Sequence, residues 1–206
     1  NLGNVYQLQG RLDLAINAYK CALEIMPGNS TSESRMMHQL SHICDWSQLD
    51  LLNNPCERLG IITTAVSPFS MLSVEDNPER QLIRSRNWVK ESYKQQPLPF
   101  PEKPKVRPKR LKIGYFSADF HDHATLYLMS GLLKSHDTSK FEIFAYSYGR
   151  SKTGDLRQKL EGSIEHFYDL TDDSDSSIVE LCRSHGLDIA IDLKGYTGSN
   201  RSAIFQ

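Results

Sequence analysis

The chain has 206 residues, of which 39% are hydrophobic and 24% charged, which is ordinary for one globular domain or two small ones. Its formal net charge of -1 gives no general attraction to nucleic acid or to an anionic membrane, so neither is an expected partner. No apolar run approaches the roughly 18 residues that a membrane span needs, and no signal peptide is recognisable.

The cysteines stand far apart and form no Cys-x-x-Cys pair: they are Cys21, Cys44, Cys56 and Cys182. This spacing predicts reduced thiols in a cytoplasmic protein. It also argues against zinc, because no two cysteines share ligand spacing. We therefore expect neither a metal nor a bound cofactor.

The chain begins with the spacing of a tetratricopeptide repeat, in which small residues lie where two helices touch and large residues fill between them. The matching positions are Leu2, Gly3, Tyr6, Ala15, Tyr19, Ala22 and Pro27. The match starts part-way through a repeat. Since one repeat cannot bury its own apolar face, we expect further repeats before it.

The remainder of residues 1–95 reads as a helical connector. Helices are predicted over residues 30–44, from Pro55 to about residue 65, and over residues 78–94, with a turn at residues 67–70. In the last helix, capped by Asp76 or Asn77, the expected buried side comprises Leu82, Ile83, Trp88 and Val89.

Residues 96–109 are rich in proline, which excludes regular helix and sheet interior and predicts an extended linker. The lysines and arginines over residues 103–112 are interpreted as solvation of this linker rather than as a binding patch.

Residues 110–206 alternate between strand and helix patterns, which predicts a doubly wound parallel sheet. The expected strands are residues 111–117, 142–148, 164–169 and 188–193, and the expected helices are residues 125–136, 155–161 and 176–185. Right-handed crossovers place the carboxyl ends of the strands on one edge. Two polar loops, residues 117–123 and 194–199, should both lie on that edge.

The first loop carries His121, Asp122 and His123 directly before a helix. Two histidines could hold a metal, with Asp122 orienting one ring, but no third ligand has a recognisable spacing. On spacing alone, a histidine in this place is more simply a helix cap or a surface residue. The positive end of the helix dipole would keep such a ring neutral.

The second loop, from Lys194 to Arg201, combines glycines, hydroxyls and an arginine at a strand end, which suits a phosphate or a sugar. It is neither a GxGxxG nor a Walker sequence, so the signal is weak by itself. Asp192, inside the preceding strand, is expected to cap the turn.

In the order and spacing of its motifs, the chain resembles the O-linked N-acetylglucosamine transferases, including SPINDLY-like and bacterial relatives with tetratricopeptide repeats. The matching segments are LKIGYFSADFHDHATLYLM, FEIFAYS and GLDIAIDLKGYTGSNRSAIF, with CDWSQLD and SPFSML in the connector. The resemblance implies a GT-B fold, of which residues 110–206 would be a partial, Rossmann-like N-terminal lobe. It also implies transfer of N-acetylglucosamine (GlcNAc) from UDP-GlcNAc to Ser or Thr of proteins.

The same resemblance implies a catalytic role near the acceptor for His123, and substrate binding by Gly195, Tyr196 and Thr197. His185 stands where some animal members have an aspartate, and Asp188 where they have a histidine. These are departures from the family pattern, so no role is carried over to either residue.

Because the C-terminal lobe is absent from the sequence, we expect the chain alone to be inactive, and its last strand to favour weak stability or a homodimer. Protein or peptide acceptors and repeat-mediated protein binding are the implied partners. Two alternatives remain open: a non-catalytic repeat scaffold that binds proteins, and a protein O-fucosyltransferase that uses GDP-fucose.

Overall fold

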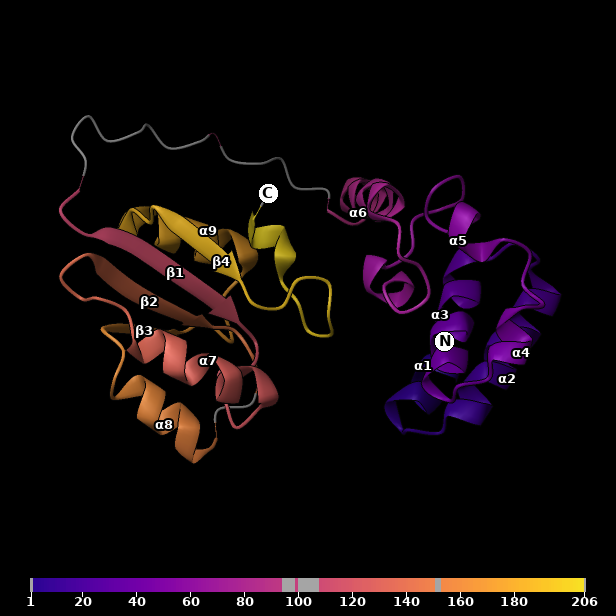
Figure 1. Cartoon of the computed structure of the whole chain (residues 1–206), viewed down its shortest axis with the longest axis horizontal. Coiled ribbons are helices and arrows are strands. Elements are labelled where there is room, and N and C mark those ends of the chain that lie inside the picture. Colours follow the sequence, from indigo (N-terminus) through magenta and orange to yellow (C-terminus); the bar gives the residue numbers. More distant parts are fainter. Residues whose placement is uncertain (1, 94–98, 100–107, 151–152, 206) are drawn as a thin grey trace. The chain divides into compact units, whose positions relative to one another are not determined.

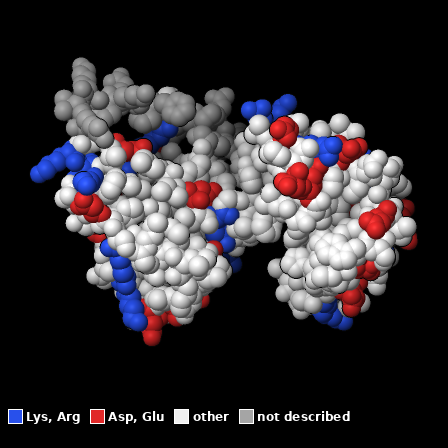
Figure 2. Space-filling model, in the orientation of Figure 1, with Lys and Arg blue, Asp and Glu red and all other residues white. Residues whose placement is uncertain are grey.

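The computed structural model describes residues 2–93, 99, 108–150 and 153–205, so nearly all of the predicted linker lies outside the described residues. The chain divides into two compact units, residues 1–95 and 96–206 (Figure 1). Within the described part, no helix is both long and apolar enough to cross a membrane. On the face shown in Figure 2, basic and acidic side chains are interspersed in each unit.

Helices α1 (Leu2–Leu8), α2 (Leu12–Ile25) and α3 (Ser30–His42) pack side by side in the first unit. The repeat spacing has a steric cause, because a Cβ on Gly3 would lie 2.4 Å from the Tyr19 ring. The Tyr19 hydroxyl donates to Asn4 Oδ1 at 2.8 Å, which ties α2 to α1. The Asn29 side chain caps α3 by accepting from the Ser32 N–H.

The connector after α3 contains three short elements: α4 (Trp46–Leu49), α5 (Pro55–Arg58) and a 3-10 turn η1 (Pro68–Met71). The helix predicted from Pro55 to about residue 65 is therefore wrong after its first turn. Leu59 is extended and Gly60 has a φ of +70°, a left-handed conformation that ends the helix and that glycine adopts without strain.

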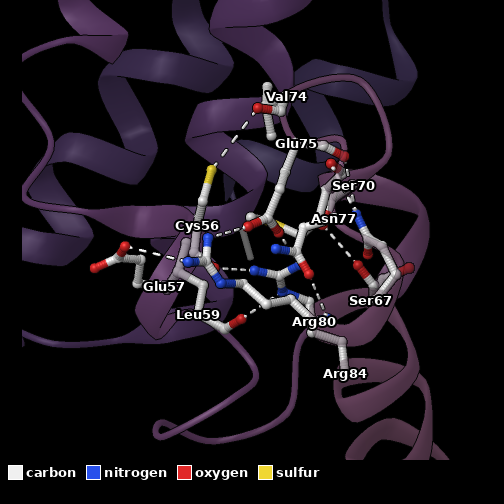
Figure 3. A network of polar contacts seen from close by, with 12 residues as sticks. Cys56, Glu57, Leu59, Ser67, Ser70, Val74, Glu75, Asn77, Arg80 and Arg84 are labelled. Atoms are coloured by element: carbon white, nitrogen blue, oxygen red, sulfur yellow. Dashed lines mark hydrogen bonds and ion pairs between the residues drawn. The ribbon is translucent and has the colours of Figure 1, made fainter.

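Helix α6 (Pro78–Ser92) is capped by Asn77, whose side chain accepts from the Arg80 N–H. Its predicted buried side is wrong for Leu82 and Ile83, which are exposed, whereas Trp88 and Val89 are half-buried and Arg84 is completely buried. Figure 3 shows the reason. The Arg84 guanidinium donates to Glu75 and to the carbonyl oxygens of Leu59 and Cys56, so a buried charge fixes the connector against α6.

The second unit is built on a four-stranded parallel sheet of order β3-β2-β1-β4 (Figure 1). Its strands are β1 (Leu111–Ser117), β2 (Phe141–Ser147), β3 (His166–Asp169) and β4 (Ile189–Asp192). The parallel arrangement and the bounds of β1 are confirmed. The two edge strands have four residues each and are shorter than predicted.

Helices cover both faces of the sheet (Figure 1). Leu126 and Leu133 of α7 (Ala124–Lys134), with Leu160 of α8 (Asp155–Glu161), pack on one face. On the other face lie α9 (Asp175–His185) and the C-terminal 3-10 turn η2 (Ser202–Phe205). Both faces of β1 and β2 are thus buried, which explains their nearly continuous apolar sequences.

Candidate functional site at the carboxyl edge of the sheet

The carboxyl end of β1 leads into a tightly held loop that we call the first edge loop, residues 118–123. The Asp119 N–H donates to Ser117 Oγ at 2.9 Å, and the side chain of Phe120, which belongs to the loop, is fully buried. The loop ends at His123, the N-cap of α7, whose Nδ1 accepts from the Thr125 N–H at 3.2 Å. His123 is therefore a helix cap, yet 42% of its side chain remains exposed.

The chain after β4 forms the second edge loop, residues 193–201, which meets the first. Lys194 Nζ lies 2.8 Å from Asp119 Oδ2, and the two side chains are only 10% and 11% exposed. The same Asp119 oxygen lies 3.6 Å from His123 Nδ1. The prediction that both loops share one edge is confirmed, since a nearly buried ion pair joins them beside His123.

The second edge loop is held by its own hydrogen bonds. Asp192 Oδ1 caps the turn by accepting from the Lys194 N–H at 2.8 Å, as predicted. The Thr197 hydroxyl donates to the Lys194 carbonyl at 2.7 Å, and Gly195 has a φ of +52°. Gly195 is exposed while Tyr196 and Thr197 are half-buried, and their role in substrate binding stays a prediction.

One side chain beneath the loops restricts their movement. Arg157 of α8 is buried and donates to the Phe120 carbonyl at 3.2 Å and to Ser147 Oγ at 3.0 Å. It thereby fastens the first edge loop to the end of β2.

Burial raises the pKa of Tyr148, and the carboxylates of Asp192 and Asp119 act in the same direction, so this phenol stays protonated.

Two polar side chains of the loops have structural partners rather than the roles considered for them. Asp122 Oδ1 accepts from the Leu156 N–H at 3.0 Å at the start of α8, so it does not orient a histidine. Arg201 Nε donates to Asp175 Oδ1 at 2.6 Å, and its guanidinium also bonds the Asp173 carbonyl. The arginine considered for phosphate therefore holds the second loop to α9.

His185 and Asp188 lie at the opposite edge of the sheet. Asp188 accepts from the Lys112 N–H at 2.9 Å, and His185 Nδ1 lies 2.8 Å from the Tyr146 hydroxyl. Lys112 is near the start of β1, and at about 3.3 Å per residue the strand separates it from Ser117 by roughly 16 Å. Neither residue can share a site with His123.

Potential metal ligands also meet at the opposite edge. Among the described residues, the one group of three His, Cys, Asp or Glu side chains with ligand atoms within 4.8 Å of one another is Glu142, Glu165 and His166. Arg110 already pairs with Glu165, with Nη1 at 2.9 Å. No such group of described residues includes His121 or His123. All four cysteines are free.

The loops leave no room for a side chain at Gly149, which follows β2. A Cβ there would lie 1.9 Å from the Ala118 carbonyl oxygen, a backbone atom that cannot rotate away. We expect Gly149→Ala to displace the first edge loop and to lower the free energy of unfolding by about 2 kcal/mol. Urea denaturation would measure the loss.

Gly198 is the matched control, because a Cβ there meets nothing within 4 Å and its φ is not left-handed. Gly198→Ala should leave the urea midpoint unchanged. Equal midpoints for the two variants would show that the close approach at Gly149 does not restrain the loop.

The profile described as glycosyl transferase family 41 matches residues 85–206, more than half of the chain. The chain belongs to this family. A tetratricopeptide-repeat profile matches residues 1–29, where α1 and α2 lie. The family profile covers the whole sheet and both edge loops, and the repeat profile confirms the interpretation of the N-terminal spacing.

Relatives in other organisms extend the match. The chain is 27% identical over 186 residues to a probable UDP-N-acetylglucosamine–peptide N-acetylglucosaminyltransferase, SEC, of Arabidopsis thaliana, covering 82% of this chain and 19% of the relative. It is 37% identical over 97 residues to the UDP-N-acetylglucosamine–peptide N-acetylglucosaminyltransferase of Caenorhabditis elegans, covering 47% of this chain and 8% of the relative. The chain therefore spans less than a fifth of the length of either relative.

A solved structure of a mutant O-GlcNAc transferase from Thermobaculum terrenum has the same fold. It aligns with a TM-score of 0.63 and 24% identity over 100% of this chain and 34% of that chain. The expected fold class is thus confirmed: a tetratricopeptide-repeat region followed by the Rossmann-like α/β part of a GT-B N-terminal lobe.

Proposed function

We propose that this protein transfers GlcNAc from UDP-GlcNAc to Ser or Thr hydroxyls of proteins, and that the carboxyl edge of the sheet forms part of the site. Membership in family 41 supports the reaction class, and the names of the relatives support the donor and the acceptor. The observation that carries the location is the half-exposed His123 at the start of α7, joined to Lys194 through Asp119.

The reaction forms a bond from the acceptor oxygen to the anomeric carbon and breaks the bond from that carbon to the diphosphate. UDP leaves with the bonding electrons, and the acceptor proton passes to a base or to solvent. Backbone N–H groups at a helix N-terminus and nearby cations stabilise charge on a phosphate. The start of α7 and Lys194 supply both at one edge of the sheet.

The repeat unit supports a protein acceptor. Its three first helices line a hollow whose wall includes Asn4, Tyr19, Thr31 and Arg35, groups that can hydrogen-bond a peptide backbone. We propose that this region binds the acceptor protein.

The direct test incubates the full-length protein with UDP-GlcNAc and a library of Ser- and Thr-containing peptides, and measures mass gain and modified residues by mass spectrometry. The 206-residue chain alone, which is expected to be inactive, is assayed beside it. A parallel reaction contains GDP-fucose instead. We expect product in the reaction with UDP-GlcNAc and none in the reaction with GDP-fucose. Product only with GDP-fucose would overturn the donor, and no product with either would contradict the proposed activity.

The ion pair between the loops gives a sharper prediction. Asp119→Asn and Lys194→Met should each lower kcat/KM about tenfold, because each leaves one nearly buried charge without its partner. The double variant should lose less than the product of the two single losses. Steady-state kinetics would measure the coupling.

Lys140→Met is the control, since Lys140 pairs with Asp137 on the exposed surface. It should retain full kcat/KM. Strictly multiplicative losses in the double variant would show that Asp119 and Lys194 act independently.

A further inference from the structure

The first turn of α7 specifies which nitrogen of His123 carries a proton. Nδ1 lies 3.2 Å from the Thr125 backbone N–H and 3.1 Å from the Thr125 hydroxyl. A backbone N–H can only donate, so Nδ1 must accept and cannot be protonated. In a neutral imidazole the proton then resides on Nε2.

We propose that His123 acts as a hydrogen-bond donor, through Nε2–H, to an oxygen of the bound substrate, and not as the base that removes the acceptor proton. The identity of that substrate rests on the proposed function. The protonation of the ring does not, because it follows from the helix cap alone.

Two charged groups lie beside His123. Asp119 Oδ2, 3.6 Å from Nδ1, would attract a proton, but Lys194 Nζ lies 2.8 Å from the same oxygen and compensates its charge. The positive end of the α7 dipole opposes an imidazolium.

The donor defines the ligand chemistry. With Nδ1 engaged by the helix and Nε2 protonated, the ring has no free in-plane lone pair with which to accept a proton. Nε2–H and the start of an 11-residue helix instead suit an oxygen with negative or partial negative charge. A phosphate oxygen or a sugar hydroxyl of the nucleotide sugar fits this description.

Two substitutions separate the two ring nitrogens. Asparagine places an oxygen near the position of Nδ1 and is a strong N-cap, so His123→Asn keeps the cap and loses the outer donor. Glutamine places its N–H₂ near the position of Nε2, so His123→Gln keeps the donor and loses the cap. The same two substitutions at His121, which caps no helix, are the controls.

The experiment that tests the proposal is long-range ¹H–¹⁵N NMR of the labelled chain, which reports the proton on each ring nitrogen, with the His123 signals assigned from the variants. We expect the Nε2–H form at neutral pH, and melting temperatures unchanged in His123→Asn and roughly 4–8 °C lower in His123→Gln. A charged or Nδ1–H ring, or equal melting temperatures, would overturn the cap argument.

The donor role is read in the GlcNAc transfer assay, where His123→Gln should retain at least about tenfold more turnover than His123→Asn, a preference worth one hydrogen bond to a charged group. Equal loss in both would overturn the donor role. Failure of the unsubstituted protein in that assay would contradict the proposed function, while the NMR result would still decide the state of His123.

Discussion

Replacing Arg157 with methionine is expected to lower the free energy of unfolding of the α/β unit by about 3–5 kcal/mol. The substitution removes the donors to the Phe120 carbonyl, Ser147 Oγ and Asp169 Oδ2. The first two lie in the buried interior, where an unpaired polar atom is costly. Urea denaturation followed by circular dichroism would measure the loss.

Activity should fall in the same variant, because the first edge loop loses its anchor at Phe120 and His123 is carried by that loop. Lys159→Met is the matched control, since Lys159 is exposed on the same helix. If the two variants unfold at the same urea concentration, Arg157 is not the anchor that its contacts indicate.

The second large effect is expected in the helical unit. Arg84→Met should lower the free energy of unfolding by about 3 kcal/mol, because it leaves Glu75 Oε2 and two carbonyl oxygens without their donor, although Arg80 still pairs with Glu75 Oε1 (Figure 3). Both tryptophans of the chain, Trp46 and Trp88, lie in this unit. Tryptophan fluorescence during denaturation therefore reports the helical unit selectively.

The stability of Arg84→Lys should lie between that of the unsubstituted protein and that of Arg84→Met. The lysine ammonium keeps the charge, but it cannot donate to Glu75, Leu59 and Cys56 together as the guanidinium does. Arg86→Met is the surface control on the same helix. A fluorescence midpoint for Arg84→Met equal to that of Arg86→Met would contradict the role assigned to the buried network.

The parts of the fold that sequence could predict are those where local pattern and tertiary environment agree. Strand β1 and helix α8 were predicted with their observed bounds, since apolar runs and amphipathic segments are local signals. The prediction of the buried side of α6 failed for the opposite reason. Arg84 carries a charge that normally marks an exposed face, and only partners from distant turns make its burial favourable.

The candidate site, too, was predicted only where the signal is local in the sequence. A histidine directly before a helix and an aspartate at a strand end are short-range caps, and His123 and Asp192 adopt these roles. The Asp119–Lys194 pair was missed, because nothing local to either residue indicates the other. The rule that right-handed crossovers bring the strand ends to one edge predicts that the two loops are neighbours. It does not predict which side chains of the loops contact each other.

The distance along the chain between these two residues has a consequence for how the site forms. Asp119 and Lys194 are 75 positions apart, and Lys194 follows β4, which among the described residues is a four-residue edge strand paired with β1 alone. Closing so long a segment costs chain entropy before the contact contributes anything. The pair can thus assemble only once β4 has docked, and it is lost whenever that edge frays. The geometry of the site therefore depends on the stability of the edge strand β4, and not on the well-packed centre of the sheet.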